Sequence, residues 1–137
     1  MRRSVATALT AATLITGAVT APAAFATTAT TAGTTAQAYS CRYSVSEPYA
    51  YAGHYSGTTV VPGSTVVTTA GIEAQCLLKR AGFDPGTIDG VFGSNSRAAA
   101  KRFQTMMNTT YGYQLATDGI VGSATWPALR TYVCYRT

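Results

Sequence analysis

The sequence predicts an all-α fold, a small three-helix bundle with two equivalent Asp-Gly turns, preceded by an irregular or short β-hairpin extension. Two observations carry this prediction. Three segments in the second half of the chain place apolar residues three and four positions apart, the spacing of one face of an α-helix. An eight-residue pattern, Asp-Gly-apolar-apolar-Gly-Ser-x-Ser/Thr, also occurs twice, 29 residues apart, at Asp89 and Asp118. A close repeat indicates one structural device used twice.

Each residue of the repeated pattern has a structural interpretation. The Asp accepts hydrogen bonds from nearby backbone N–H groups, and the glycine after it, Gly90 or Gly119, can adopt the positive φ of a tight turn. The second glycine, Gly93 or Gly122, allows close backbone approach, and the Ser and Thr residues that follow are good helix N-caps. The pattern therefore predicts a turn into a helix and not a catalytic motif.

Residues 1–26 have the features of a secretory signal peptide. Arg2 and Arg3 form a basic start, an uncharged and mildly apolar run follows, and Ala24-Phe25-Ala26 presents the small-x-small pattern that signal peptidases cut. A membrane anchor is the rival interpretation, but the run is short, rich in threonine and followed by no basic cluster. We therefore expect a secreted protein with no membrane contact after cleavage.

Composition beyond the signal peptide excludes several classes of function. Removing two of the ten basic residues leaves a net charge of 8 − 5 = +3. That charge is too small to indicate a nucleic-acid partner, and it suits an anionic cell envelope or simply a solvated surface. With a single histidine, His54, and no zinc-type cysteine spacing, we expect no metal and no cofactor. Three cysteines in an exported, oxidising setting predict one disulfide and one remaining thiol.

The segment before the helices has two parts. Residues 27–57 comprise a flexible Thr/Ala-rich leader and a tyrosine-rich extension, whose rings are expected to drape over the domain surface; an aromatic strip for stacking on sugars or partners is the alternative. Residues 58–69 carry β-branched runs on either side of Pro62-Gly63, which predicts a small hairpin. A type II Pro-Gly turn suits a two-residue hairpin poorly, so a longer loop or an irregular pair remains open.

The helical domain is expected over residues 70–137. The first helix should run from about residue 69 to Gly82, the second over 94–107 and the third over 124–132, with an enlarged loop at 108–114. The apolar positions of these segments predict a core of Leu77, Leu78, Ile88, Phe92, Ala100, Phe103, Ile120, Val121, Trp126 and Leu129.

Further residues between about 70 and 132 occur at characteristic spacings. They are Glu73-Ala74-Gln75-x-x-Leu78, Gly82-Phe83-x-Pro85-Gly86-x-Ile88-Asp89-Gly90-x-Phe92-Gly93, Phe103-Gln104 and Asp118-Gly119-Ile120-Val121-Gly122-x-x-Thr125-Trp126-x-x-Leu129. Together they resemble the peptidoglycan-binding domain 1 family, the three-helix, internally repeated module attached to many bacterial wall hydrolases. The Cys-x-Tyr start of the extension and the Glu-Ala-Gln-Cys sequence also resemble small exported actinobacterial proteins of this type.

The resemblance implies a secreted, extracellular or cell-wall-associated module that binds peptidoglycan and is not an enzyme. It implies structural roles for Asp89, Gly90, Gly93, Asp118, Gly119, Gly122 and Trp126. The family usually has a branched apolar residue at Gly71, so the first helical turn is expected to fray. The residues themselves also disfavour catalysis, because only His54 could serve a nucleophilic triad and both repeat aspartates are committed to turns.

Four residues are expected to form the peptidoglycan-binding site. Tyrosine rings stack on the apolar faces of glycan-strand sugars, whereas Arg and Lys pair with stem-peptide carboxylates. Arg97, Lys101, Tyr111 and Tyr113 would lie together if the enlarged loop folds over the second helix. Ordinary solvation is the alternative for each exposed cation. The alternative function is a protein–protein interaction module, an inhibitor or partner of a secreted hydrolase.

The disulfide is expected to join Cys41 and Cys76. Cys76 lies beside the apolar stripe of the first helix and can face a neighbouring segment, while Cys41 begins an extension with too little apolar area to dock unaided. The resemblance implies the same pairing through its Cys-x-Tyr and Gln-Cys features. The pairs Cys41–Cys134 and Cys76–Cys134 remain open, and any bridge requires Cα atoms about 4.4–6.8 Å apart.

Overall fold

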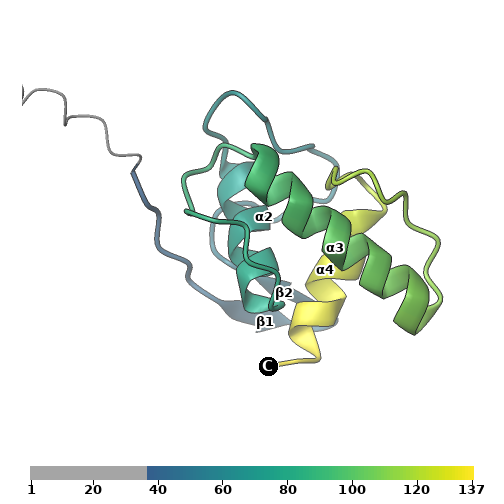
Figure 1. Ribbon diagram of the computed structural model, residues 1–137. Helices are drawn as coiled ribbons and strands as arrows, with labels where there is room; N and C mark the ends of the chain where they lie inside the picture. Colours follow the sequence, from purple (N-terminus) through teal and green to yellow (C-terminus); the bar gives the residue numbers. More distant parts are fainter. Residues whose placement is uncertain (1–36) are drawn as a thin grey trace, which may run out of the picture. The chain divides into compact units, whose positions relative to one another are not determined.

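The computed structural model describes residues 37–137, so the predicted signal peptide and most of the Thr/Ala-rich leader lie outside the described residues. The elements follow in the order β1 (Ser44–Ser46), β2 (Tyr49–Tyr51), α2 (Thr69–Arg80), α3 (Ser94–Tyr111) and α4 (Thr125–Cys134) (Figure 1). Three helices preceded by a short hairpin are therefore confirmed. Within residues 37–137, no helix has the length and apolar character needed to cross a membrane.

The β-hairpin lies earlier in the chain than the sequence predicted. Strands β1 and β2 pair antiparallel, with Val45 opposite Ala50. The hairpin expected over residues 58–69 is wrong, because residues 58–68 are irregular. Their backbone groups bond to the loop before α3 instead: the N–H of Phe92 donates to Gly63 O at 2.8 Å, and the N–H of Thr68 donates to Gly90 O at 3.0 Å. The two β-branched runs therefore do not pair with each other.

Helix α2 begins without fraying, contrary to the expectation from Gly71. The side chain of Thr68 caps the helix by accepting the Gly71 N–H at 2.9 Å. Gly71 is buried, and a Cβ at this position would collide with the carbonyl of Gly90. The absence of a side chain at Gly71 thus lets the helix start pack directly against the first Asp-Gly segment.

Helix α3 is one turn longer than predicted. It continues past Met107 to Tyr111 and ends at Gly112, which adopts the left-handed conformation with φ 73°. Nothing between residues 108 and 111 breaks a helix, so the first left-handed glycine sets the end. The side chain of Asn108 then ties the following loop to the helix, donating to Leu115 O at 2.8 Å and accepting the Leu115 N–H at 2.8 Å. The expected loop over 108–114 therefore starts only at residue 112.

The core lies between the three helices. Phe92 is 2% exposed, and Trp126, Phe103, Leu77, Leu78 and Leu129 are fully buried. Ile120 departs from the predicted core, because its side chain is 36% exposed. The segment around it is held through its backbone, since Gln104 donates to Ile120 O at 2.9 Å. That contact leaves the Ile120 side chain on the surface.

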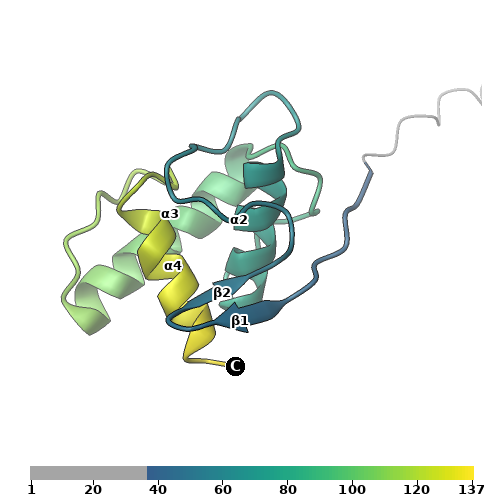
Figure 2. The ribbon, with the colours of Figure 1, turned by 180° about the vertical axis from the view of Figure 1, so that it is seen from behind.

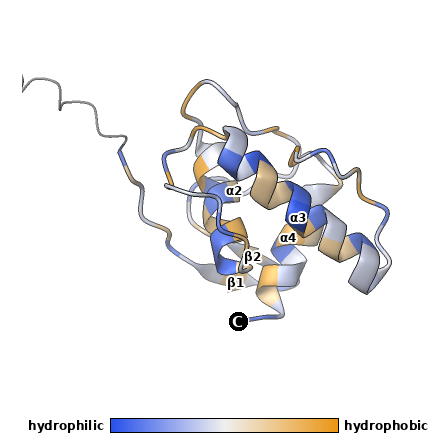
Figure 3. Cartoon of the chain, viewed as in Figure 1, coloured by the Kyte–Doolittle hydropathy of each residue, from blue (hydrophilic) through white to orange (hydrophobic). Residues whose placement is uncertain are grey.

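The three helices and the extension form two sides of the domain. Helix α3 crosses in front of α2 and α4 in Figure 1, whereas the view from behind in Figure 2 places β1, β2 and the irregular segment over α2 and α4. In the hydropathy view of Figure 3, hydrophilic bands recur along α3. We call the side covered by residues 39–68, which include β1 and β2, the extension side. We call the opposite side, formed by α3, the α3 side. The extension leaves the α3 side uncovered.

Candidate functional site

A buried ion pair holds the extension against the helices. Arg130 of α4 donates to Glu73 of α2 at 2.8 Å, and both side chains are 0% exposed. Glu73 also accepts the backbone N–H groups of Ala52, His54 and Tyr55 at 2.8, 2.9 and 3.2 Å. The guanidinium donates to the carbonyls of Ala50, Tyr55 and Gly57. The ion pair therefore binds the extension through its backbone, independently of most of its side chains.

Aromatic rings of the extension side are used for packing. Trp126 is buried, and its indole N–H donates to Val60 O at 2.9 Å. The Arg130 guanidinium lies 4.5 Å from the ring centroid of Tyr51 and 5.0 Å from that of Trp126. The Tyr55 hydroxyl accepts the Val60 N–H at 3.0 Å, and this bond lowers the pKa of the phenol. Trp126 is fully covered, whereas Tyr51 and Tyr55 are half-buried and line a hollow of about 280 Å³ with Gly53, His54 and Ser56.

The disulfide joins Cys41 to Cys76, which confirms the predicted pairing. Their Cα atoms lie 5.7 Å apart, within the range that a bridge requires. Next to the bridge, the Tyr43 hydroxyl donates to Cys76 O at 2.9 Å, and burial raises the pKa of this phenol. Cys134, in the last turn of α4, is a free thiol. Covalent and ionic contacts together fasten the extension to α2 and α4.

Sequence reasoning missed the role of Arg130. Trp126, Leu129 and Val133 define the buried face of α4, and Arg130 falls on that same face, one turn after Trp126. An arginine in an apolar stripe signals a buried partner, because an unpaired buried charge is costly. Its partner could have been sought in Glu73, a carboxylate in the first helix close to the small residues Ala70 and Gly71.

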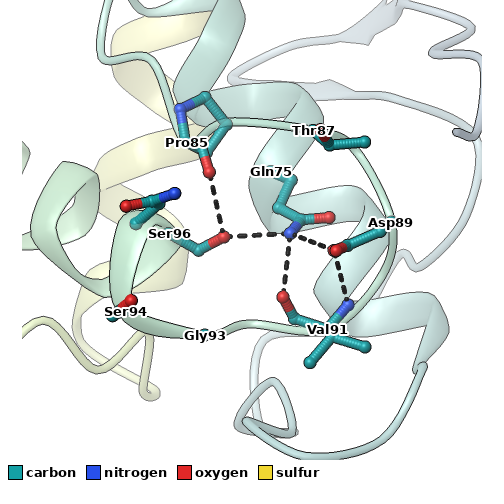
Figure 4. A pocket seen from close by; sticks show the side chains of 9 residues that line it. Gln75, Pro85, Thr87, Asp89, Val91, Gly93, Ser94 and Ser96 are labelled. Carbon is teal, nitrogen blue, oxygen red and sulfur yellow. Dashed lines mark hydrogen bonds between the residues drawn. The ribbon is translucent and has the colours of Figure 1, made fainter. Parts of the chain in front are cut away.

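A glutamine at the centre of the first Asp-Gly segment organises its backbone (Figure 4). The side-chain amide of Gln75 donates toward Asp89 Oδ1 at 3.0 Å, Val91 O at 3.1 Å and Ser96 Oγ at 2.9 Å. Its oxygen accepts the Gly90 N–H at 2.8 Å. Asp89 in turn accepts the Val91 N–H at 3.0 Å. Helix α2 thereby fixes the loop that leads into α3.

Gln104 makes the corresponding contacts in the second Asp-Gly segment. Its amide nitrogen lies 3.4 Å from Asp118 Oδ1 and 3.1 Å from Thr125 Oγ1, and its oxygen accepts the Gly119 N–H at 2.9 Å. Asp118 accepts the Ile120 N–H at 2.8 Å. Each Asp thus bonds to the backbone two residues on. Each glutamine lies 14 residues before its Asp, so the 29-residue spacing includes the glutamines as well as the turns.

The hydroxyl groups after the second glycines do not cap the helices as predicted. The N-cap residues are Gly93 for α3 and Ala124 for α4, and neither makes a side-chain capping bond. Ser96 and Thr125 instead accept hydrogen bonds from the buried glutamines. A buried amide needs acceptors more than an exposed helix end does, because water satisfies the free N–H groups of the helix.

A hollow of about 240 Å³ opens between the first Asp-Gly segment and the start of α3 (Figure 4). Polar groups of Gln75, Asp89 and Ser96 line its floor, and the exposed residues Ser94 and Asn95 lie at its margin. The floor groups bond to one another, as described above. They therefore hold the loop in shape, and the hollow itself is a structural feature of the turn.

The four predicted site residues lie on the α3 side in two separate groups. Arg97 and Lys101 are exposed in the N-terminal half of α3, whereas Tyr111 is its last residue and Tyr113 follows in the loop. Fourteen helical positions separate Arg97 from Tyr111, about 21 Å along the axis at 1.5 Å per residue. The loop runs back along the helix past Asn108, but Tyr111 and Tyr113 stay beside Met107 at its C-terminal end, so the single cluster expected for these residues does not form.

Three helices joined by two glutamine-held loops define a small helical module whose polar interior is used for its own architecture. Residues 71–129 match the model of the family described as "Putative peptidoglycan binding domain". No curated protein and no solved structure matches the chain. The matched segment begins after the extension and ends just before Arg130. It contains Glu73 and both glutamines.

Proposed function

We propose that this protein is a secreted, non-catalytic module that binds bacterial peptidoglycan through its α3 side. The family match to residues 71–129 is the observation that carries the proposal. We choose the α3 side because the extension covers much of the opposite side of the domain. The extension occupies the surfaces of α2 and α4, and the family's Trp126 lies beneath it. We therefore assign ligand contact to the exposed residues of α3, the loop after it and the C-terminal end of α4, where Tyr135 is exposed.

The charges of α3 support binding of stem-peptide carboxylates. Arg97, Lys101 and Arg102 are exposed, and the helix contains no acidic residue. Across residues 37–137 the ion pair formed is Arg130–Glu73, so the α3 cations are not neutralised by acidic side chains of the described domain. Arginine and lysine pair well with carboxylates, and at the surface each pair contributes only modestly. Binding therefore requires several such contacts along the polymer.

The acidic groups support a non-catalytic role because three of the five carboxylates have a structural function. Glu73 is buried in the ion pair, and Asp89 and Asp118 accept backbone N–H groups of their own loops. The ring of His54 bonds to Ser40 O at 2.7 Å. Glycoside hydrolysis needs two carboxylates facing a substrate, and these side chains are engaged elsewhere.

A secreted, cell-wall-associated location agrees with two features. The disulfide Cys41–Cys76 is of the kind that persists in oxidising compartments. The first 26 residues carry the sequence pattern of a signal peptide. Secretion would be tested by expressing the full chain in a bacterial host and determining the N-terminus of the protein recovered from the medium. A mature start at residue 27 is expected, and an intact Met1 in the cytoplasm would contradict it.

Binding is tested by co-sedimentation of the disulfide-bonded protein with purified, insoluble peptidoglycan sacculi. Saturable loss of protein from the supernatant is expected, and it should weaken as salt screens the α3 cations. Capture of secreted proteins on the immobilised domain, run in parallel, tests the interaction-module alternative. The proposal fails if the protein stays in the supernatant with sacculi but retains a secreted hydrolase.

A further inference from the structure

Four tyrosines surround a hollow where the ends of α3 and α4 meet. The hollow measures about 200 Å³ and is lined by Met107, Tyr111, Tyr113, Thr131, Tyr132, Tyr135 and Arg136. Tyr135 is 71% exposed, Tyr111 56% and Tyr113 40%, so three rings present accessible surface. We call these residues the tyrosine hollow. A concave surface lined by several exposed rings is a candidate interaction site, because aromatic side chains commonly line ligand pockets.

The fixed part of the tyrosine hollow is the ring of Tyr132. It packs edge-to-face on the buried Phe103, with centroids 5.7 Å apart, and on Tyr111, with centroids 5.9 Å apart. Arg136 lies over the same ring at 5.2 Å from its centroid and donates to its hydroxyl. The core therefore holds Tyr132 in place before any ligand arrives. Preorganised rings lose little conformational freedom on binding.

The charge of the tyrosine hollow selects the kind of ligand. Arg136 is the charged residue in its lining, and its guanidinium is already placed on Tyr132. The cations suited to stem-peptide carboxylates, Arg97 and Lys101, lie toward the other end of α3. What remains are aromatic faces and phenol hydroxyls, which complement flat apolar sugar faces and their hydroxyl and acetamido groups. The two ends of the α3 side thus match the two chemistries of one polymer.

From this arrangement we infer that the tyrosine hollow binds the acetylated sugars of a glycan strand. The inference rests on the proposed function and assigns the sugar-binding part of it to one place. Thr131, Tyr132, Tyr135 and Arg136 lie beyond residue 129, where the family match ends, whereas Met107, Tyr111 and Tyr113 lie within it. Four of the seven lining residues therefore fall outside the matched segment.

The binding experiment uses a soluble oligomer of N-acetylglucosamine and the disulfide-bonded domain. Titration followed by amide chemical shifts should move the resonances of residues 107–113 and 131–136, at the rim of the hollow. Tyr111→Ala and Tyr135→Ala should each weaken binding roughly tenfold, the equivalent of about 1.4 kcal/mol for one stacked ring. Tyr111→Phe and Tyr135→Phe keep the ring and should retain most of the affinity.

Tyr43→Ala is the control, because Tyr43 is an exposed tyrosine on the extension side, outside the tyrosine hollow. It should bind the oligomer like the unchanged protein, with thermal melts showing that every variant is folded. Shifts confined to residues outside the rim, or equal affinity in all variants, would overturn the inference.

Two outcomes separate this inference from the proposed function. If sacculi bind the protein but the oligomer does not, and Tyr111→Ala sediments unchanged, the sugar assignment fails while the proposed function stands. If sacculi fail to bind, the proposed function itself fails. A dimer in sedimentation velocity that Tyr135→Ala converts to monomer would mean that a second copy fills the hollow, which also overturns the inference.

Discussion

The extension side and the α3 side use the same residue types for different purposes. On the extension side Tyr51 packs against the buried Arg130 and Tyr55 packs against Trp126, whereas Tyr111 and Tyr135 are exposed on the α3 side. Arginine divides in the same way, since Arg130 is fully buried and Arg97 is exposed. The comparison shows that aromatic and basic residues become candidates for ligand binding only where the chain leaves them uncovered. Amino-acid composition alone does not distinguish a structural tyrosine or arginine from one that is free to bind a ligand.

The largest effect should come from breaking the extension side at its centre. Glu73→Ala leaves Arg130 buried without its carboxylate and frees three backbone N–H groups of the extension. Removing one partner of a buried pair costs roughly 3–5 kcal/mol, so we expect a loss of that size in the free energy of unfolding, measured by urea titration. Glu47→Ala, an exposed carboxylate in the hairpin turn, is the control. Equal midpoints for the two variants would contradict the role of the ion pair.

Opening the disulfide should have the next largest effect. Cys41 and Cys76 are 35 residues apart in sequence, and closing a loop of this length contributes about 3–4 kcal/mol in the chain-entropy model. Cys41→Ser should therefore lower the urea midpoint strongly. Cys134→Ser removes the thiol that forms no bridge and should shift the midpoint little. A similar shift for both serine variants would show that the bridge does not fasten the extension.

The two buried glutamines sharpen the comparison, because Gln75 of α2 holds the loop before α3 and Gln104 of α3 holds the loop after it. Gln75→Ala leaves the buried Gly90 N–H without its acceptor, and Gln104→Ala does the same to Gly119. Each should cost about 1–3 kcal/mol by thermal or urea melts, the penalty of an unsatisfied buried group. Gln114→Ala, at an exposed loop position, should be nearly neutral. If either buried glutamine is as tolerant as Gln114, the loops are held by other contacts.

Much of the helical domain could be predicted from local patterns. Three- and four-residue apolar spacing located the helices, and the start of α3 at Ser94 follows from the repeated pattern. The role of the glutamines could not be read this way, because their partners lie 14 to 21 residues further along the chain. The site was predicted only in part. Exposure of Arg97 fits the helix pattern, but Tyr111 was expected in a loop and is instead the last residue of α3, so the separation of the two depends on where α3 ends.

The extension was the least predictable region. Its order comes from Glu73 and Arg130, which are 57 residues apart and bind its backbone. No periodicity in residues 39–68 reports such contacts, and β propensity alone placed the hairpin in the wrong segment. Pro62-Gly63 looked like a hairpin turn, yet the Gly63 carbonyl bonds to Phe92 instead. Long-range polar contacts overrode local preference here.

The smallest expected effect concerns binding, and it tests the central claim that the α3 side is the peptidoglycan-binding surface. Arg97→Glu and Arg42→Glu change the net charge equally, but Arg97 is exposed on α3 and Arg42 is exposed on the extension. The measurement is the dissociation constant from co-sedimentation with purified sacculi. We predict that Arg97→Glu weakens binding about three- to tenfold, the size of a reversed surface ion pair, and that Arg42→Glu leaves it unchanged. Equal losses in the two variants, or a loss confined to Arg42→Glu, would contradict the assignment of binding to the α3 side.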